Sequence, residues 1–297
     1  MIKVGKGGDF GYNSIQVAIN AASPGETIEV HPGTYHEQIS VNKPLNIKGV
    51  GGPIVDGRAG VNGTNNGLPG GNVAKFAPGT NFGFKHTNLV NLNADNITWD
   101  GVHVTRSMGS GIAVYRPGGG RIKNPVVKNC RITRNRHRGL EQLHVDGMLL
   151  ANVFMYQNVQ WVEGSTDPVH GANMNGRDVQ DLTVIDCVIA GSYGEGVMID
   201  ANHYESKNLN FINSVFYDNL WGTLNLAGSS GITIDGCLLY ASEDYWDPSK
   251  PNQWIPRGLV MRGREPELGD HANWHGIRNA LVQNTILVGC SSDVILG

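Results

Sequence analysis

The sequence predicts an all-β protein, a parallel β-helix that begins with a short capping α-helix. Three observations predict this fold class: abundant glycine, a strand-like unit that recurs along the chain, and one amphipathic helix ahead of the first unit. Of the 297 residues, 41 are glycine and only 16% are charged, which favours short strands and tight turns over a coiled coil or a disordered chain. A β-helix grows by adding units, so we expect residues 1–297 to form one elongated domain.

The N-terminal segment predicts the cap. A helix over about residues 13–22 would start at Asn13 or Ser14, both good N-cap residues, and would place four apolar side chains on one face. These side chains are Ile15, Ala18, Ile19 and Ala22. Such a helix can cover the open end of the first coil, whose strand edges are otherwise unpaired. Coils are expected from about residue 27, where three strand-like pieces follow and the first two are separated by a Pro32–Gly33 turn.

The recurring unit has one polar corner. A β-rich strand leads to Asn, Asp or Gly, a second short strand follows, and after a variable loop Gly begins a third strand, as in "GIAVYR" and "GVMID". Successive corners lie 23 to 34 residues apart, except for a last interval of 48. Asn, Asp and Gly tolerate the left-handed backbone of a sharp corner, and stacked Asn side chains can hydrogen-bond to one another. The predicted corners are Gly101, Asn129, Asn152, Asp186, Asn213, Gly236 and Asn284.

Three of the four cysteines occupy one position of this unit. Cys130, Cys187 and Cys237 each follow a corner residue directly, which indicates a core position. Cysteines in alternate coils would lie ~10 Å apart, too far for a disulfide. None of the four, Cys290 included, has the spacing of a metal site. We therefore expect four free thiols, three of them buried.

On these residues the chain resembles a known superfamily. The run from Ser14 to Gly49 is similar to the opening of right-handed parallel β-helix proteins of the pectin-lyase-like superfamily, and the repeats with polar corners resemble their coils. The resemblance implies a right-handed helix and an extracellular, periplasmic, or cell- or virion-surface location, although the sequence begins without the core of a signal peptide. Members include polysaccharide lyases, glycoside hydrolases, uronate epimerases and phage tailspikes, so the fold does not decide the function.

In the resembled enzymes the sheet of Gly-initiated strands forms the substrate groove. Side chains alternate between core and solvent along a strand, so Leu143 and Val145 are expected inside and His144 between them outside. The same alternation over the other strands gives a polar outer stripe. Its expected members are Tyr115, His144, Asp146, Asn173, Asn175, Asp200, Asn225 and Arg262, with Glu195 and His203 at the rims.

This stripe predicts a carbohydrate-active enzyme, and foremost a polysaccharide lyase that acts on a uronate-containing glycan. β-Elimination needs a base next to the uronate carboxylate and a cation that stabilises the developing charge. His144, Arg138 or Arg262 are candidate bases, and Ca²⁺ is a candidate cation held by Asp146, Asn175 and Asp200. A glycoside hydrolase would instead use a carboxylate pair such as Asp146 and Asp200. The expected substrate-binding residues are Tyr115, Arg136, Asn173, Asn175, Glu195, His203, Trp221 and Asn225.

A basic block supports an acidic partner. Between Gly101 and Leu140 there are nine basic residues and no acidic ones. Arg binds carboxylates bidentately, so the block predicts an acidic polysaccharide, although solvation or contact with another subunit would also explain it. The net charge of −3, and a basic block without interleaved aromatic residues, argue against nucleic acid. No apolar run approaches the ~20 residues of a membrane helix.

Four insertions interrupt the repeat, at about 58–72, 156–171, 241–257 and 263–275. They carry four tryptophans, which can stack on sugar rings or pack the loops down: Trp161, Trp246, Trp254 and Trp274. The alternative to an enzyme is a non-catalytic glycan-binding or structural segment of a tailspike, adhesin or surface protein. The sequence stops within an expected strand, "SSDVILG", which suggests a longer chain, or an end covered by a partner such as another copy.

Overall fold

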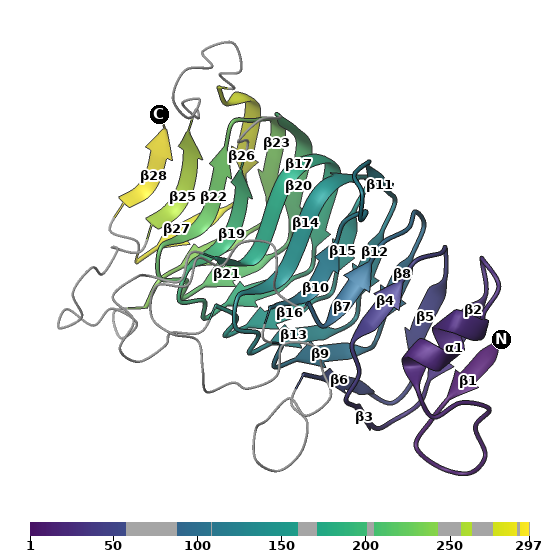
Figure 1. Ribbon diagram of the computed structural model, residues 1–297. Coiled ribbons are helices and arrows are strands. Elements are labelled where there is room, and N and C mark those ends of the chain that lie inside the picture. Colours follow the sequence, from purple (N-terminus) through teal and green to yellow (C-terminus); the bar gives the residue numbers. More distant parts are fainter. Residues whose placement is uncertain are drawn as a thin grey trace, which may run out of the picture.

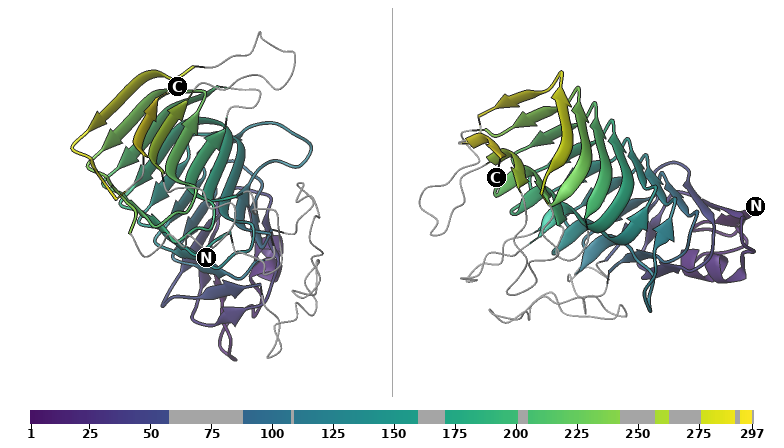
Figure 2. Two further views of the ribbon diagram at one scale, coloured as in Figure 1. Left: turned by 90° about the vertical axis from the view of Figure 1, so that its left-hand side faces the viewer. Right: turned by 90° about the horizontal axis from the view of Figure 1, so that it is seen from above.

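The computed structural model describes residues 1–57, 88–107, 109–159, 171–200, 205–242, 257–262, 276–289 and 292–296, and of residues 257, 262 and 292–296 it describes the backbone alone. Within these ranges short parallel strands stack in successive coils, three strands to a coil (Figure 1). The two further views show the strands of successive coils lying side by side along one axis (Figure 2). The predicted fold class is confirmed. No helix among the described residues has the length and apolar character needed to cross a membrane.

Each coil contributes to three parallel sheets. The first sheet contains β4 (Ile39–Val41), β7 (Val90–Leu92), β10 (Ser110–Val114), β14 (Arg138–Asp146), whose last two residues continue into the second sheet, the first half of β17 (Ala172–Ile185), β19 (Glu195–Asp200), β22 (Gly222–Ala227), β25 (Arg257–Arg262) and β28 (Ser292–Leu296). The second contains β1 (Ile2–Val4), β2 (Thr27–Val30), β5 (Asn46–Gly49), β8 (Thr98–Asp100), β11 (Ile122–Lys123), β12 (Val126–Lys128), β15 (Leu149–Ala151), the second half of β17, β20 (Ser206–Ile212), β23 (Ser229–Asp235) and β26 (Arg278–Gln283). The third contains β3 (Thr34–Tyr35), β6 (Ile54–Asp56), β9 (His103–Thr105), β13 (Arg131–Thr133), β16 (Phe154–Tyr156), β18 (Val188–Ala190), β21 (Val215–Tyr217), β24 (Leu238–Tyr240) and β27 (Ile286–Val288).

The polar corners lie between the second and third sheets, as predicted. Asn129 and Asn152 have φ of 54° and 51°, and the other predicted corner residues are also left-handed. The Asn152 Nδ2 donates to Asn129 Oδ1 at 2.9 Å, and the Asn129 Nδ2 donates to Asp100 Oδ1 at 2.8 Å. At the other end of the column, Asn284 donates to Asp235 Oδ1 at 2.9 Å. From Gly101 to Gly236 each corner amide also donates to the carbonyl of the residue that precedes the next corner, so the corners stack in one column.

The cap and the cysteines also lie where the sequence predicts them. Helix α1 (Ile15–Ala21) has Ser14 as N-cap, whose side chain accepts a hydrogen bond from the Val17 amide, and its predicted apolar face is buried. Glu37 reinforces this end, because its carboxylate accepts hydrogen bonds from the Ile15 and Gln16 amides at the positive end of the helix. Cys130, Cys187 and Cys237 are buried free thiols. Cys290 lies outside the described residues.

A second column of asparagines lies inside the solenoid, between the third and first sheets. The Asn135 Nδ2 donates to Asn158 Oδ1 at 2.8 Å, the Asn158 Nδ2 to Asn173 Oδ1 at 2.8 Å, and the Asn173 Nδ2 to Asn219 Oδ1 at 3.1 Å. All four side chains are fully buried. The prediction that Asn173 faces the groove is therefore wrong. At the chain position where the neighbouring coils have a ladder asparagine, this coil has Ser192, and the side-chain amide of Asn173 fills the resulting gap in the ladder.

This ladder explains three glycines near the start of first-sheet strands, Gly111, Gly139 and Gly196. A Cβ added to Gly111, Gly139 or Gly196 would come within 2.5 to 2.7 Å of the Nδ2 of Asn135, Asn158 or Asn219. A side chain at these positions would displace a fully buried amide that has no alternative partner. Glycine is thus required by close packing, and the strand that follows starts directly beside the ladder.

Candidate functional site

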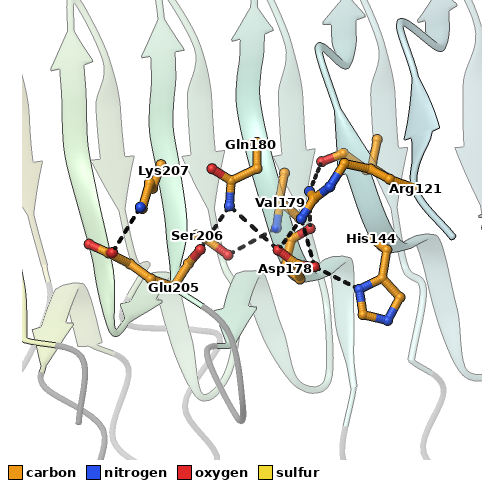
Figure 3. Close-up of polar contacts among 9 residues, drawn as sticks. Arg121, His144, Asp178, Val179, Gln180, Glu205, Ser206 and Lys207 are labelled. Atoms are coloured by element: carbon orange, nitrogen blue, oxygen red, sulfur yellow. Dashed lines mark hydrogen bonds and ion pairs between the residues drawn. The ribbon is translucent and has the colours of Figure 1, made fainter. Parts of the chain in front are cut away.

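The turn between the first and second sheets holds a cluster of His144, Asp178 and Arg121 (Figure 3). The Asp178 Oδ2 lies 2.7 Å from His144 Nδ1. The Arg121 Nη2 donates to both carboxylate oxygens of Asp178, at 2.7 and 2.8 Å, and its Nη1 donates to the Asp178 carbonyl at 3.3 Å. The carboxylate is thus held from two sides, by an imidazole and by a guanidinium.

Strand register brings these residues together. Strands β14 and β17 run continuously through the turn, and Leu143 pairs with Arg177 on one side of it while Val145 pairs with Val179 on the other. His144 and Asp178 are the turn residues between those pairs, with φ of 53° and 52°. They therefore lie one above the other in successive coils. Arg121 precedes β11, which pairs with the end of β14, so it approaches Asp178 from across the intervening coil.

The turn also corrects the predicted register of β14. Leu140 and Gln142 point inward, at 0% and 1% exposure, whereas Leu143 does not belong to the core. The expectation that Leu143 and Val145 both point inward is wrong, because the left-handed residue His144 between them breaks the alternation. Glu141 and Leu143 are the outward side chains of β14 before the turn, and the sequence did not identify Glu141.

Asp178 is a buried carboxylate that keeps its charge. Its side chain is 6% exposed. Burial by itself raises the pKa of Asp178, but the hydrogen bonds from His144 and Arg121, together with the Arg121 charge and a hydrogen bond from Gln180, outweigh burial and hold that pKa below its ordinary value. The aspartate is therefore ionised at neutral pH, and an ionised carboxylate can only accept hydrogen bonds.

This charge state fixes the tautomer of His144. Because Asp178 only accepts, Nδ1 of His144 must carry the proton, and in the neutral ring the lone pair is then on Nε2. The Nε2 lies on the edge of the ring that points away from Asp178 (Figure 3). The His144 side chain is 33% exposed, so solvent or a ligand can reach the ring. The arrangement is that of a histidine general base held by a carboxylate.

A second set of contacts supports the cluster from the next coil. The Gln180 Nε2 donates to Asp178 Oδ1 at 3.4 Å and to the Glu205 carbonyl at 2.8 Å, and the Val179 amide donates to Ser206 Oγ at 3.1 Å (Figure 3). The Glu205 carboxylate in turn pairs with Lys207 at 3.3 Å and with Arg278 at 2.7 Å. Hydrogen bonds and ion pairs from the following coils therefore stabilise the turn.

The outer face of the first sheet, next to His144, carries a row of charged and amide side chains. Register aligns Glu141 with Asn175, and Leu143 with Arg177 and Asp200. Arg138 forms an ion pair with Glu141, whose other oxygen accepts a hydrogen bond from Ser110 Oγ at 2.9 Å. The pKa of Arg138 is lowered, first by burial, and Glu141 and Glu195 oppose this while Arg177 adds to it. These charges are close enough to act on one another.

The predicted site residues divide between this row and other places. Asn175, Glu195, Asp200 and Asn225 are all less than 9% exposed on the first-sheet strands, and Tyr115 and Trp221 are half-buried. Arg136 is buried, and burial lowers its pKa. His203, the four loop tryptophans and nearly all of the four insertions lie outside the described residues, as does the side chain of Arg262.

Asp146 and Asp200 do not form the predicted carboxylate pair. Asp200 pairs with Arg177 before the turn, in the first sheet, whereas Asp146 pairs with Gln180 after the turn, in the second sheet. The hydrolase geometry predicted from these two residues is therefore wrong. Among the described residues, no three His, Cys, Asp or Glu side chains converge as metal ligands. The Ca²⁺ hypothesis with Asp146, Asn175 and Asp200 remains a prediction, although register separates Asp146 from the other two.

More than half of the basic block is neutralised by aspartates of other segments and by Glu141, which lies on the same strand as Arg138. Five of its nine members form ion pairs: Arg106 with Asp56, Arg116 with Asp95, Arg121 with Asp178, Lys128 with Asp100, and Arg138 with Glu141. The local charge excess seen in the sequence is thus mostly balanced between coils, and it gives little support to an acidic ligand.

Sequence reasoning missed Arg121, Asp178 and Glu141. One signal was present: "LHV" of 143–145 and "RDV" of 177–179 align, and this alignment would have placed a histidine above an aspartate. It could only be recognised once the turn was known to interrupt the alternation.

Solved structures with the same fold include enzymes and a phage protein. The A-module of mannuronan C-5 epimerase AlgE4 from Azotobacter vinelandii matches with a TM-score of 0.53 and 11% identity, over 94% of this chain and 84% of that one. The N-terminal fragment of bacteriophage Phi29 gene product 12 matches with a TM-score of 0.54 and 14% identity, over 95% of this chain and 56% of that one. At such identities these similarities show the fold alone.

Sequence comparison agrees with the fold. No curated protein matches the sequence. A family model described as a right handed beta helix region matches residues 85–247, more than half of the chain, and thereby also confirms the expected hand. The protein therefore belongs to the right-handed β-helix family and has a pectin-lyase-like fold.

Proposed function

We propose that this protein is a carbohydrate-active enzyme that removes the C5 proton of a uronate residue in an acidic glycan, and specifically a polysaccharide lyase. One observation carries the proposal: the His144 ring is held by the buried Asp178 through Nδ1, with Nε2 directed away from it. A base for this chemistry must be reachable and fixed in tautomer, and both conditions hold for His144. A mannuronan C-5 epimerase with the same fold supports a uronate as substrate.

The proposed steps follow from the neighbouring charges. His144 Nε2 takes the proton at C5, and the electron pair of that C–H bond forms a C4–C5 double bond as the C4–oxygen bond breaks. The leaving oxygen takes up a proton from water. Arg177 precedes Asp178 on β17 and would stabilise the negative charge that develops on the uronate carboxylate. An epimerase would share the first step and return a proton to the opposite face of C5.

The test is a substrate panel with a His144→Gln variant. Alginate, polygalacturonate and hyaluronan are incubated with and without chelator, and three signals are followed: absorbance of the unsaturated product, new reducing ends, and deuterium uptake at C5 in D₂O. We expect the unsaturated product on one substrate, and a rate roughly 10²–10⁴ lower in His144→Gln. His36→Gln is the control, because His36 is an exposed histidine of the first coil, far from His144 along the solenoid axis.

Two results would contradict the proposal. If folded His144→Gln keeps the parent rate, the base lies elsewhere. If none of the three signals appears on any substrate, the chain is better described as a non-catalytic β-helix segment. Deuterium uptake without an unsaturated product would assign epimerisation in place of elimination.

A further inference from the structure

The outer face of the third sheet changes character along the solenoid. In β9 and β13 the outward side chains are polar: His103, Thr105, Arg131 and Thr133. From β16 onward the outward side chains are apolar or aromatic and none is charged. These ten positions are Phe154, Tyr156, Val188, Ala190, Val215, Tyr217, Leu238, Tyr240, Ile286 and Val288, and we name them the third-sheet strip.

The strands of this region are apolar on both faces. Their central residues, such as Ile189 and Phe216, fill the core. The apolar character of the outward residues is therefore not needed for core packing. Most outward positions of the second sheet in the same coils are polar instead, as in Lys207, Asn210 and Thr233, although Ile185, Ile212 and Leu281 are apolar. Tyr240, Ile286 and Val288 are 37%, 60% and 46% exposed. A contiguous apolar strip beside a mostly polar sheet is a candidate binding face.

Aromatic rings run along the strip in the direction of the solenoid axis. One outward column holds Tyr156, Tyr217 and Tyr240, with Ala190 between the first two. Across the strip, within β16, the rings of Phe154 and Tyr156 stack, with centroids 5.6 Å apart and 25° between their planes. The Tyr156 ring extends over the next coil, where a Cβ on Gly191 would lie 2.7 Å from it. Burial, and after it the charges of Tyr156 and Asp218, raise the pKa of Tyr217. Tyr240 follows in the next coil, directly in register with Tyr217.

The size of the strip decides which partner it fits. Five strands spaced by ~4.8 Å give a length of ~19 Å, and the two outward columns lie ~7 Å apart. This footprint of a few hundred Å² is well short of the ~800 Å² that each partner contributes to a stable protein interface. A single polysaccharide chain is narrow enough for it. The apolar faces of sugar rings stack on aromatic rings, and tyrosine hydroxyls can hydrogen-bond to sugar hydroxyls.

We propose that the third-sheet strip is a non-catalytic binding site for an uncharged polysaccharide chain that lies along the solenoid axis. None of the ten side chains is basic, and Arg131, whose guanidinium lies 5.5 Å from the Phe154 ring centre, borders the strip at one end only, so an uncharged glycan fits the strip better than an acidic one. The strip belongs to a different sheet from the turn that holds His144, so the proposal does not depend on the lyase reaction.

The test measures retardation of the native protein in gels that contain hydroxyethylcellulose or xylan, and depletion by chitin particles. We expect the parent to bind at least one of these polysaccharides, and binding to persist in ~1 M NaCl because no charge is involved. Replacing both Tyr217 and Tyr240 by Ala should lower the affinity about tenfold, whereas replacing both by Phe should keep most of it, since the rings remain. Tyr193→Ala is the matched control, a 42% exposed tyrosine outside the strip. His144→Gln should bind like the parent, which separates this proposal from the catalytic one.

Three results would overturn the proposal. The parent could fail to bind all three polysaccharides, or the double Ala variant could bind as well as the parent. Light scattering could also show a parent dimer that the double Ala variant dissociates, and the strip would then be a self-association face.

Discussion

At the scale of single residues, His144 shows how one backbone angle sets the chemistry of a site. Its φ of 53° ends the first-sheet part of β14 and turns its side chain to the outer edge of the turn. Asp178 repeats this angle in the next coil, and the two side chains therefore meet. If side chains alternated regularly along these strands, each of the two residues would point either into the core or outward from the face of one sheet. The left-handed turn instead aligns them along the axis.

Asp178 acts as a positioning residue, and its substitution should reveal this. Asp178→Asn removes the charge that requires the Nδ1–H tautomer, so we expect turnover to fall at least about tenfold with little change in KM. Asp178→Glu should recover part of the turnover. Nitrogen NMR of the His144 ring should show a shift from the Nδ1–H tautomer in Asp178→Asn. Asp181→Asn, on the same strand and also left-handed, is the control. An unchanged tautomer with a lower turnover would mean that Asp178 only supports folding.

Glu205 should contribute to acid stability. Burial raises the pKa of its carboxyl, but hydrogen bonds from Ser230, Arg278 and Lys207 outweigh burial and lower it to about 2. Because the folded pKa lies below the unfolded value of about 4.3, the stabilisation is complete above that value and is lost as pH falls toward 2. Glu205→Gln should therefore melt a few degrees below the parent at pH 6, and the difference should shrink between about pH 5 and pH 2. A difference independent of pH would show that the carboxylate charge is not the cause.

At the scale of strands and turns, buried polar columns align the coils. The inner asparagine ladder, with Asn158 and Asn173 at its centre, satisfies backbone and side-chain groups that water cannot reach. Glycine at the start of the adjacent strand leaves the space for it. The ladder packs beside the first-sheet strands that carry His144 and Asp178, so we expect it to support their register.

A pair of glycines in successive coils tests this dependence. A Cβ at Gly196 would lie 2.5 Å from the Thr223 carbonyl oxygen and 2.6 Å from Asn219 Nδ2, whereas a Cβ at Gly222 meets nothing closer than 3.9 Å. We expect Gly196→Ala to lower the free energy of unfolding by ~1–3 kcal/mol and Gly222→Ala to change it by less than ~0.5 kcal/mol. Denaturant unfolding followed by circular dichroism measures both. Equal effects in the two variants would contradict the packing argument.

At the scale of the whole molecule, each coil interacts mainly with its neighbours. Ion pairs such as Arg106–Asp56 and Lys128–Asp100 join successive coils, so charges that are segregated in sequence become balanced in space. The core is a continuous apolar column bounded at one end by α1. Stability of such a solenoid is close to a sum over units and their interfaces.

The reactivity of the cysteine thiols measures whether this core is intact. Burial raises the pKa of Cys130, Cys187 and Cys237, that of Cys187 to about 11, so their reactive thiolates are scarce at neutral pH. We expect these three to resist a thiol reagent in the native protein, and all four cysteines to react after denaturation without reductant. Counting two or fewer thiols in the denatured protein would show a disulfide and would refute the coil register.

The sequence by itself determined the fold, the corner column, the cap helix and the buried thiols. These follow from local rules, because left-handed corners need Asn, Asp or Gly and apolar side chains must alternate toward a core. Only the tertiary structure decided the site. The turn at His144 breaks the alternation, Asn173 fills a ladder gap left by Ser192, and the basic block meets its aspartates one or more coils away. Each of these depends on contacts between residues 15 or more positions apart, and a local pattern contains no information about which residues of the next coil will face it.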